Sequence, residues 1–484
     1  MFSIESSLLR RSINADIVSP LTTLGASRLD PSTAEHKPSP PSEKILIHGI
    51  NYAPEQIGVG RYTAQLAEYL SANGHIVEVV TAPPHYPGWF VRTGYRANWY
   101  SRETLNGVKV YRCPLLLRKN GSGFWRFLAP LSFAIAAAPL VAWRTLCFRP
   151  KSVICIEPTL LSAPAASLAA KLVGAKRILH VQDLEVDAAF AVGHLKSGLK
   201  ERIALLFERI VLRKFQTIVT VSERMRERLL QKQLPPESVH VVRNWVDLSQ
   251  IKPLPAPNTF RQELRLRDDA FVVLYAGHIG QKQALHLVFA AAEKLRGADR
   301  IQFVIAGEGS LKHKYEAQYG GMPNIHFLPL QPEERLCELL NLADLHILPQ
   351  DRGAADLVLP SKLGGTLASG RPLLVQADAG TELHNLLSGI ALVVPAGDVD
   401  ALARAIADAS TQALSVEGYG EVAAFFARDR VLPIFRELIG AQPPLVMTNF
   451  WVRVVIAAFM YVVENIRALF HGFSQVKGAS EPAE

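Results

Sequence analysis

Short apolar runs alternate with amphipathic stretches along most of the chain from Lys44 onward. Residues 45–49 have the pattern of a buried strand, and a loop then leads to Gly60. In the stretch that follows, Tyr62, Leu66 and Leu70 share one helical face, and a second strand is predicted at residues 75–81. Strand, glycine loop, helix and strand in this order predict a βαβ unit, whose crossover requires parallel strands and a right-handed connection.

This alternation recurs in two blocks. The first block has predicted strands at 153–156, 177–181, 217–221 and 239–242, with helices at 164–173 and through Ile203, Phe207 and Ile210. The second block has predicted strands at 271–276, 301–306, 325–328 and 345–348, with a helix to Leu295 and another at 332–342. We therefore expect an α/β protein with two Rossmann-like, doubly wound domains that face a central cleft.

The domain boundaries follow from shifts in composition. A passage rich in proline at residues 252–257 predicts the crossing between the two halves. The start of the chain is rich in Ser, Pro and Thr and has too little apolar periodicity to fold. The expected order is a disordered leader at 1–43, an N-terminal domain at 44–245, a C-terminal domain at 246–440 and an amphipathic tail at 441–484.

Composition excludes some classes of protein. A length of 484 residues with 49% apolar and 20% charged residues is incompatible with a single small module or with wholesale disorder. The four cysteines form neither a C-x-x-C pair nor a zinc pattern with histidine, which predicts a reduced cytoplasmic protein without a structural metal. We also find no secretory signal.

The net charge of +8 is concentrated in one stretch, where residues 100–151 hold nine basic side chains and one acidic side chain. These basic residues flank the apolar run 128–143, which has 16 residues and two prolines and is shorter than the roughly 20 needed to span a bilayer. The pattern favours peripheral association with the inner face of the cytoplasmic membrane over binding to nucleic acid, although a core position for the run is also possible. The basic residues are Arg102, Lys109, Arg112, Arg118, Lys119, Arg126, Arg144, Arg149 and Lys151.

Glycine loops follow several predicted strands. Gly58 and Gly60 lie after the first strand, Gly277 and Lys282 lie after the strand at 271–276, and the sequence Gly307-Glu308-Gly309 follows the strand at 301–306. Pro360-Ser361-Lys362 precedes a further helix. Each lysine alone could simply be solvated, but glycine loops and lysines gathered at the carboxyl ends of one sheet predict a shared phosphate site.

The order of these motifs resembles the family-4 retaining glycosyltransferases of the GT-B fold over roughly residues 44–440. The resemblance rests on the glycine loops together with residues 243–247, 327–330 and 369–372. Within that family, residues 52–55, 181–184, 280–283 and 352–363 resemble exopolysaccharide transferases of the colanic acid type.

This resemblance implies a nucleotide-sugar donor in the C-terminal domain, a polyprenyl-diphosphate-linked sugar acceptor in the N-terminal domain, and no cofactor or required metal. Asp183 and Lys282 would be the catalytic residues, with Lys282 neutralising the departing pyrophosphate. Acceptor contacts would come from His85 and Gln182. The implied donor contacts are Gly58, Gly60, Gly277, His278, Lys282, Gly307, Glu308, Gly309, Leu330, Asp356, Ser361 and Lys362.

The sequence departs from the family pattern at two positions. Gln182 stands where many relatives have His, and Gly365 stands where the second glutamate of a spaced pair is usual, with Leu357 eight residues earlier. Asp356 is the candidate that replaces the lost acid. These departures keep a catalytically degenerate scaffold open as an alternative, and a sugar-nucleotide 2-epimerase of the same fold is another. Asp183 could also be a helix cap, and His85 could be a packed loop histidine.

Overall fold

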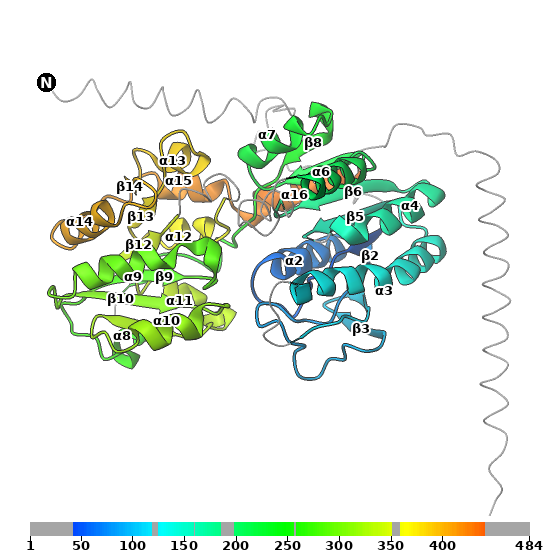
Figure 1. Ribbon diagram of the computed structural model, residues 1–484. Coiled ribbons are helices and arrows are strands. Elements are labelled where there is room, and N and C mark those ends of the chain that lie inside the picture. The colour runs from blue at the N-terminus through cyan, green and yellow to red at the C-terminus, as the bar shows by residue number, and fades with distance from the viewer. Residues whose placement is uncertain are drawn as a thin grey trace, which may run out of the picture. The chain divides into compact units, whose positions relative to one another are not determined.

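The structure, a computed structural model, describes residues 42–118, 124–158, 160–184, 198–255, 258–350 and 359–440 (Figure 1). The expected tail at 441–484 lies outside these residues, as does the expected leader apart from its last two residues. The described chain forms two parallel-sheet α/β domains, which confirms the predicted fold class.

The first sheet has eight strands in the order β3-β4-β2-β1-β5-β6-β7-β8. All neighbouring pairs are parallel except β3 and β4, which form an antiparallel hairpin at one edge. The strands are β1 (Lys44–His48), β2 (Ile76–Thr81), β3 (Ser101–Leu105), β4 (Val108–Arg112), β5 (Ser152–Glu157), β6 (Lys176–Val181), β7 (Thr217–Thr220) and β8 (Val239–Val241). The associated helices are α2 (Val59–Ala72), α3 (Phe124–Phe148), η1 (Leu160–Ser162), α4 (Ala163–Val173), α6 (Leu199–Leu212), α7 (Glu223–Gln231) and η2 (Pro236–Ser238).

The second sheet has six parallel strands in the order β11-β10-β9-β12-β13-β14. They are β9 (Phe271–Ala276), β10 (Ile301–Ala306), β11 (Ile325–Leu328), β12 (Leu345–Leu348), β13 (Leu373–Gln376) and β14 (Leu392–Val394). The first four lie where the apolar runs predict them. The helices are α8 (Thr259–Glu263), η3 (Gln281–Gln283), α9 (Leu285–Lys294), α10 (Lys312–Tyr319), η4 (Glu333–Arg335), α11 (Leu336–Leu340), α12 (Leu363–Ala368), α13 (Glu382–Leu387), α14 (Val399–Ala409), α15 (Tyr419–Ala424) and α16 (Arg428–Gly440).

Apolar side chains fill both faces of the first sheet. Leu46, Val80 and Val153 pack under α3 and α4, whereas Ile45, Ile47 and Val79 pack under α2 on the opposite face. Successive strand residues point to opposite faces, so a strand covered on both sides is apolar at consecutive positions. This explains why the parallel strands could be recognised from continuous apolar runs.

The chain crosses between the two sheets next to Val246. Val246 pairs with Ala427 as an isolated bridge, and its amide donates to the carbonyl of Phe426 at 2.7 Å. The described part of the proline-rich passage lies beyond this point, within the expected C-terminal domain at 246–440. Leu254 donates its amide to Asn341 at 2.8 Å, and Pro253 packs against Gly370, so the described part of this passage belongs to the C-terminal domain.

The last described helix returns to the first sheet. Leu432 and Phe435 of α16 are fully buried in the same apolar cluster as Ile45 and Ile154, and Figure 1 shows α16 among the elements of the N-terminal domain. Residues 428–440 therefore pack with the N-terminal domain, although their place in the sequence assigned them to the C-terminal one. The chain therefore crosses between the domains twice, near Val246 and again before α16, so a single boundary in the sequence cannot separate the two domains.

The basic stretch at 100–151 is only partly available to a membrane. The side chain of Arg112 is buried and pairs with Glu103, Arg144 pairs with Glu78 at 2.7 Å, and Lys151 pairs with Glu43. Arg112 and Arg144 therefore do not contribute to a membrane-facing surplus, because buried positive charges need nearby carboxylates, whereas Lys151 is paired but stays exposed.

The apolar run at 128–143 lies in a 25-residue helix, α3, which includes Pro130 and Pro139. Among the described residues, its segment 128–148 is the one helix whose length and composition would allow it to cross a membrane, with 33% of its apolar window buried in the protein. Phe133 and Val141 are fully buried against the first sheet. One face of α3 is therefore part of the core.

Candidate active site

The loop after β1 is fixed by the buried carboxylate of Glu55. Its Oε1 accepts hydrogen bonds from the backbone amides of His85 and Tyr86, both at 3.0 Å, and its Oε2 accepts one from the Asn51 side chain at 3.0 Å. A Cβ atom on Gly60 would lie 2.4 Å from Glu55 Oε2, so the helix start can approach this carboxylate only without a side chain. Glu55 thus joins the loops that follow β1 and β2.

His85 belongs to this buried junction. The residue is 6% exposed, its Nδ1 donates to the carbonyl of Pro83 at 2.9 Å, and its ring meets Trp89 edge to face. Nδ1 also lies 3.6 Å from Glu55 Oε1. These contacts place the predicted acceptor residue within the packing of the loop.

Tyr86 connects the loops of the two domains. Its ring stacks on His278, with centroids 5.7 Å apart and planes inclined by 27°, and it lies against Gly58 at the start of α2. Burial raises the pKa of Tyr86 to about 12, and the nearby carboxylates of Glu55 and Asp183 act in the same direction. The predicted residues Gly58, Asp183 and His278 therefore converge on one aromatic side chain.

Gln182 and Asp183 follow β6 at the carboxyl edge of the first sheet. Gln182 is buried, and its Nε2 lies 3.0 Å from Nε2 of His180. A short contact between two nitrogens requires the imidazole to accept, so the amide donates. The Gln182 side chain therefore points toward its own sheet. The neighbouring Asp183 is half-buried, and its carboxylate helps to raise the pKa of Tyr86.

Two glycine loops of the C-terminal domain lie directly against each other. The amide of Gly277 donates to Ala306 and that of Ile279 donates to Glu308, both at 2.9 Å. Gly307 has a φ of 146°, and a Cβ atom there would lie 1.8 Å from the carbonyl oxygen of Gly277. The contact requires glycine on steric grounds, and it places Gly277, His278, Gly307, Glu308 and Gly309 at the ends of adjacent strands.

Lys362 approaches the first of these loops from α12. Its Nζ lies 3.5 Å from the ring centroid of Tyr275, whose hydroxyl donates to the carbonyl of His278 at 2.6 Å. Desolvation lowers the pKa of Lys362 to about 7. The ring face is a weak substitute for a carboxylate, so this ammonium group is poised to gain a stronger anionic partner.

Contacts from the N-terminal domain reach the same part of the C-terminal domain. The Tyr62 hydroxyl donates to the carbonyl of Ser361 at 3.3 Å, and Arg61 pairs with Glu333 at 2.8 Å. A small cavity nearby is lined by Val221, Asn244, Leu359, Pro360, Ser361 and Phe426, which come from both domains. The start of α2 and the start of α12 therefore border the cleft together.

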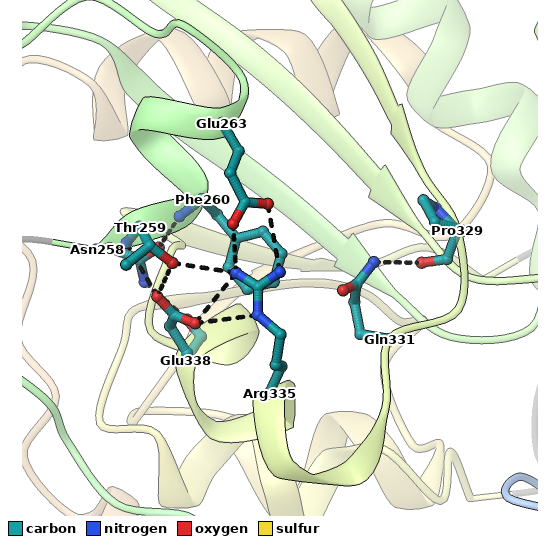
Figure 2. A network of polar contacts seen from close by, with 8 residues as sticks. All are labelled: Asn258, Thr259, Phe260, Glu263, Pro329, Gln331, Arg335 and Glu338. Carbon is teal, nitrogen blue, oxygen red and sulfur yellow. Dashed lines mark hydrogen bonds and ion pairs between the residues drawn. The ribbon is translucent and has the colours of Figure 1, made fainter.

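Arg335, a few residues after Leu330, joins η4 and α11 to α8 (Figure 2). The Arg335 guanidinium lies 3.9 Å from the Phe260 ring centroid and pairs with Glu263 at 2.7 Å and with Glu338 at 3.3 Å. Figure 2 shows these groups converging from α8 and from η4 with α11. Leu330 is half-buried, and Gln331 donates to the carbonyl of Pro329 at 3.0 Å.

Comparison with known proteins identifies the family. The model of a glycosyl transferase 4-like domain matches residues 58–245, and that of the glycosyl transferases group 1 matches residues 257–421. WcaI of Escherichia coli (strain K12), named as a colanic acid biosynthesis glycosyl transferase, is 40% identical over 395 residues, which cover 79% of this chain and 95% of WcaI. The chain belongs to this glycosyltransferase family.

Solved structures agree with the fold of the glycosyltransferase. Sucrose-phosphate synthase from Thermosynechococcus elongatus superposes with a TM-score of 0.64 at 17% identity, covering 83% of this chain and 100% of that one. Anabaena HepE, solved in complex with UDP-glucose, gives a TM-score of 0.60 at 14% identity with the same coverage of both chains. At these identities the likeness shows the GT-B fold.

The glycosyltransferase has an apolar environment at the position of the missing glutamate. A Cβ atom on Gly365 would lie 3.6 Å from Leu340 and 4.0 Å from Val246. A carboxylate there would meet these side chains, so the departure is consistent with the local packing. The candidate replacement, Asp356, lies outside the described residues, as does the side chain of Lys282 in η3.

Two residues that contact the candidate site were missed by reasoning from sequence. Tyr86 follows the histidine that attracted attention, and Tyr275 is the penultimate residue of a buried strand. Buried aromatic residues usually belong to the core, so the sequence gives no sign of a functional role. Only the contact of Tyr86 with His278 and that of Tyr275 with Lys362 connect them to the candidate site. Glu308, by contrast, was predicted, and its carboxylate pairs with Lys312 at 2.6 Å. Among the residues that the structure describes, no group of three potential ligands could hold a metal ion.

Proposed function

We propose that this glycosyltransferase moves a sugar from a nucleotide-sugar donor to a lipid-linked saccharide, with retention of anomeric configuration, in exopolysaccharide assembly of the colanic acid kind. The observation that carries the proposal is the stack of Tyr86 on His278, which unites the strand-end loops of both domains. The name of WcaI supports the pathway, and the UDP-glucose complex of HepE supports the donor class.

The proposed donor site consists of the paired glycine loops, His278, Lys282 and Lys362, with Asp356 and the segment at Leu330 toward the nucleoside. Backbone amides and two cations suit a pyrophosphate, which carries negative charge that increases as the sugar leaves. Glu308 lies beside this site with its charge paired to Lys312. Gly58 and Gly60 have no side chains, so the backbone of this loop of the N-terminal domain can approach the same phosphates closely.

The proposed acceptor site lies at the carboxyl edge of the first sheet. In this proposal Asp183 positions and polarises the attacking hydroxyl of the acceptor. His85 and Gln182 form the surrounding wall, since both are buried and hydrogen-bonded within their own domain. The lipid portion of the acceptor implies that the protein works at the inner face of the cytoplasmic membrane.

A panel of nucleotide sugars tests this function. The true donor should raise the melting temperature, because a ligand at 100 times its Kd adds about 2.7 kcal/mol of stability. Incubation with that donor and a lipid-linked acceptor should then yield the extended lipid. Epimerisation of the free sugar nucleotide without an acceptor, or binding without any transfer, would contradict the proposal.

Donor binding should weaken as the pH rises, because Lys362 binds the pyrophosphate only when protonated. Its pKa of about 7 in the free protein should rise next to phosphate, so binding takes up a proton above pH 7. We expect the affinity for the nucleotide sugar to fall about tenfold between pH 6 and pH 8, measured by calorimetry. The variant Lys362→Arg remains charged throughout and should show a flat profile. An equal fall in this variant would rule out Lys362 as the titrating group.

Lys282→Ala should weaken donor binding by at least about tenfold, since a charge-assisted hydrogen bond contributes about 1.5 to 3 kcal/mol. Asp356→Ala should cause a smaller loss if this carboxylate replaces the missing glutamate. Titration of the donor with each variant measures both effects, and the exposed Lys314→Ala serves as a matched control. Parental binding and transfer by both variants would place the donor site elsewhere.

A further inference from the structure

Exposed apolar side chains are concentrated in the N-terminal domain. Of the fourteen large apolar residues that are exposed in the described part of the chain, only Val416 lies in the C-terminal domain. The others include Trp99, Leu116, Ile135, Trp143 and Leu168, with exposed fractions from 41% to 68%. Large apolar clusters at the surface of a soluble protein mark sites of interaction.

Helix α6 has the clearest apolar stripe. Ile203, Leu206, Phe207 and Ile210 occupy positions i, i+3, i+4 and i+7, so they share one face of the helix, and they are 58%, 58%, 36% and 48% exposed. The opposite face is already packed, since Val211 and Leu212 lie in the core cluster beneath the sheet. Glu208 is buried there too and pairs with Lys232. An outward stripe of this kind is not explained by folding of the domain.

Helices α3, α4 and α6 cover one face of the first sheet. Phe133 of α3, Ala166 of α4 and Val211 of α6 belong to a single core cluster on the same face of that sheet. Their outward faces therefore form one surface, which contains Ile135 and Trp143 of α3, Leu168 of α4 and the α6 stripe. The residue before β3 adjoins this surface, because the Tyr100 hydroxyl donates to the carbonyl of Ala136 at 2.8 Å.

Basic residues border this surface along one edge. Exposed Arg149 follows α3, Lys171 lies in the last turn of α4, and exposed Arg213 and Lys214 follow α6. The strands that begin after these helices are neighbours in the sheet, so their four positive charges share the edge at the amino ends of β5, β6 and β7. Among the described side chains of the three helices, no acid is exposed, since Glu201 is half-buried and Glu208 buried.

We propose that the outward faces of α3, α4 and α6 together form a docking surface for an anionic lipid bilayer, with the helices lying in the plane of the interface and the basic edge at the headgroups. An apolar face with a cationic border is the composition that binds such a surface. A second copy of this chain is a less suitable partner, because the same three helices of that copy would offer no exposed acid to pair with the basic edge. The inference rests on the proposed lipid-linked acceptor and identifies the surface that would bring the enzyme to it.

The surface also explains why α3 does not need to span the bilayer despite its length. Phe133, Ala137 and Val141 are fully buried, and Arg144 of the same helix pairs with Glu78 within the protein. Removing α3 into lipid would expose the sheet that it covers. Its outer face can enter the interface while its inner face stays in the core.

Flotation of the full-length protein with vesicles tests the surface. We expect binding to vesicles that contain phosphatidylglycerol and weaker binding to pure phosphatidylcholine. The variant Ile203→Gln/Phe207→Gln/Ile210→Gln should lose at least about tenfold in partition coefficient. Its control is Val416→Gln, which changes an exposed apolar residue of the C-terminal domain and should bind like the parent. Parental binding by the α6 variant would overturn the proposal.

Stabilisation by the nucleotide-sugar donor should be unchanged in the α6 variant. If the donor binds but neither variant nor parent floats, the docking surface is wrong while the proposed function stands. If the protein floats but no nucleotide sugar binds, the proposed function fails instead.

An environment-sensitive fluorophore at position 207 identifies the occupant. It is attached to Phe207→Cys in a Cys147→Ser/Cys337→Ser background, which removes the half-buried thiols. A blue shift that appears only on addition of anionic vesicles supports lipid as the occupant. A blue shift without vesicles overturns it: dependence on protein concentration would identify a second copy, and independence would identify another segment of this chain.

Discussion

Replacing Asp183 by Asn should lower turnover by about a hundredfold, because misplacing the acceptor hydroxyl that this carboxylate positions costs about 10² in rate. The residue follows β6 at the carboxyl edge of the first sheet, and its charge acts on Tyr86 at the junction of the two domains. The donor binds through the opposite domain in our proposal, so its affinity should change by less than about threefold. Single-turnover transfer and donor titration measure the two quantities separately.

The substitution also distinguishes catalysis from helix capping. Asn caps a helix about as well as Asp does, so a residue that only caps would tolerate Asp183→Asn with parental turnover. The exposed Asp268→Asn is a control for the chemical change itself. Parental turnover in Asp183→Asn would remove the carboxylate from the mechanism, whatever its effect on stability.

Glu55→Ala should destabilise the N-terminal domain by about 4 kcal/mol. The substitution removes the acceptor for two buried backbone amides and one side-chain amide, and hydrogen bonds to a charged group contribute about 1.5 to 3 kcal/mol each. The loop that holds Tyr86 against His278 would lose its anchor, so donor-dependent transfer should fall as well. Urea unfolding followed by tryptophan fluorescence measures the stability change.

Glu55→Gln is the matched variant. Its amide oxygen can still accept from His85 and Tyr86, and Asn51 can present its oxygen to the new NH₂ group, so the loss should be about 1 kcal/mol. Equal losses in the two variants would mean that the negative charge, not the hydrogen-bond pattern, holds the loops. No loss in Glu55→Ala would mean that the loops are fixed without this carboxylate.

The sequence alone was sufficient for most of the parallel strands and for the family. Parallel strands that are buried on both faces have continuous apolar runs, which is why the predicted bounds of β9, β10, β11 and β12 agree with the structure. Glycines at strand ends could also be predicted as close contacts, because only glycine allows the approach seen between Gly307 and Gly277. The motif order was enough to assign a glycosyltransferase.

The hairpin β3-β4 could not be predicted, and proline content did not mark where the chain crosses between the domains. Strand β3 is largely exposed and polar, so it has no apolar run, and its pairing with β4 is decided by the sheet edge that it extends. Proline content marks stiff segments, but the described part of the proline-rich passage packs against Gly370 and Asn341 within one domain. Which segment crosses depends on contacts between residues distant in sequence, as between Val246 and Ala427.

The charges show most clearly what only tertiary structure decides. From the sequence, Arg112 and Arg144 belong to the same basic stretch as Arg149, yet the first two are paired with Glu103 and Glu78 inside the fold whereas Arg149 is exposed. The sequence likewise assigned no role to Tyr86, and it gave α6 an apolar face without showing that the face is outward. Sequence patterns report how a residue relates to its neighbours along the chain. Ion pairing and exposure depend on which distant segments the fold brings into contact, so only the tertiary structure decided them.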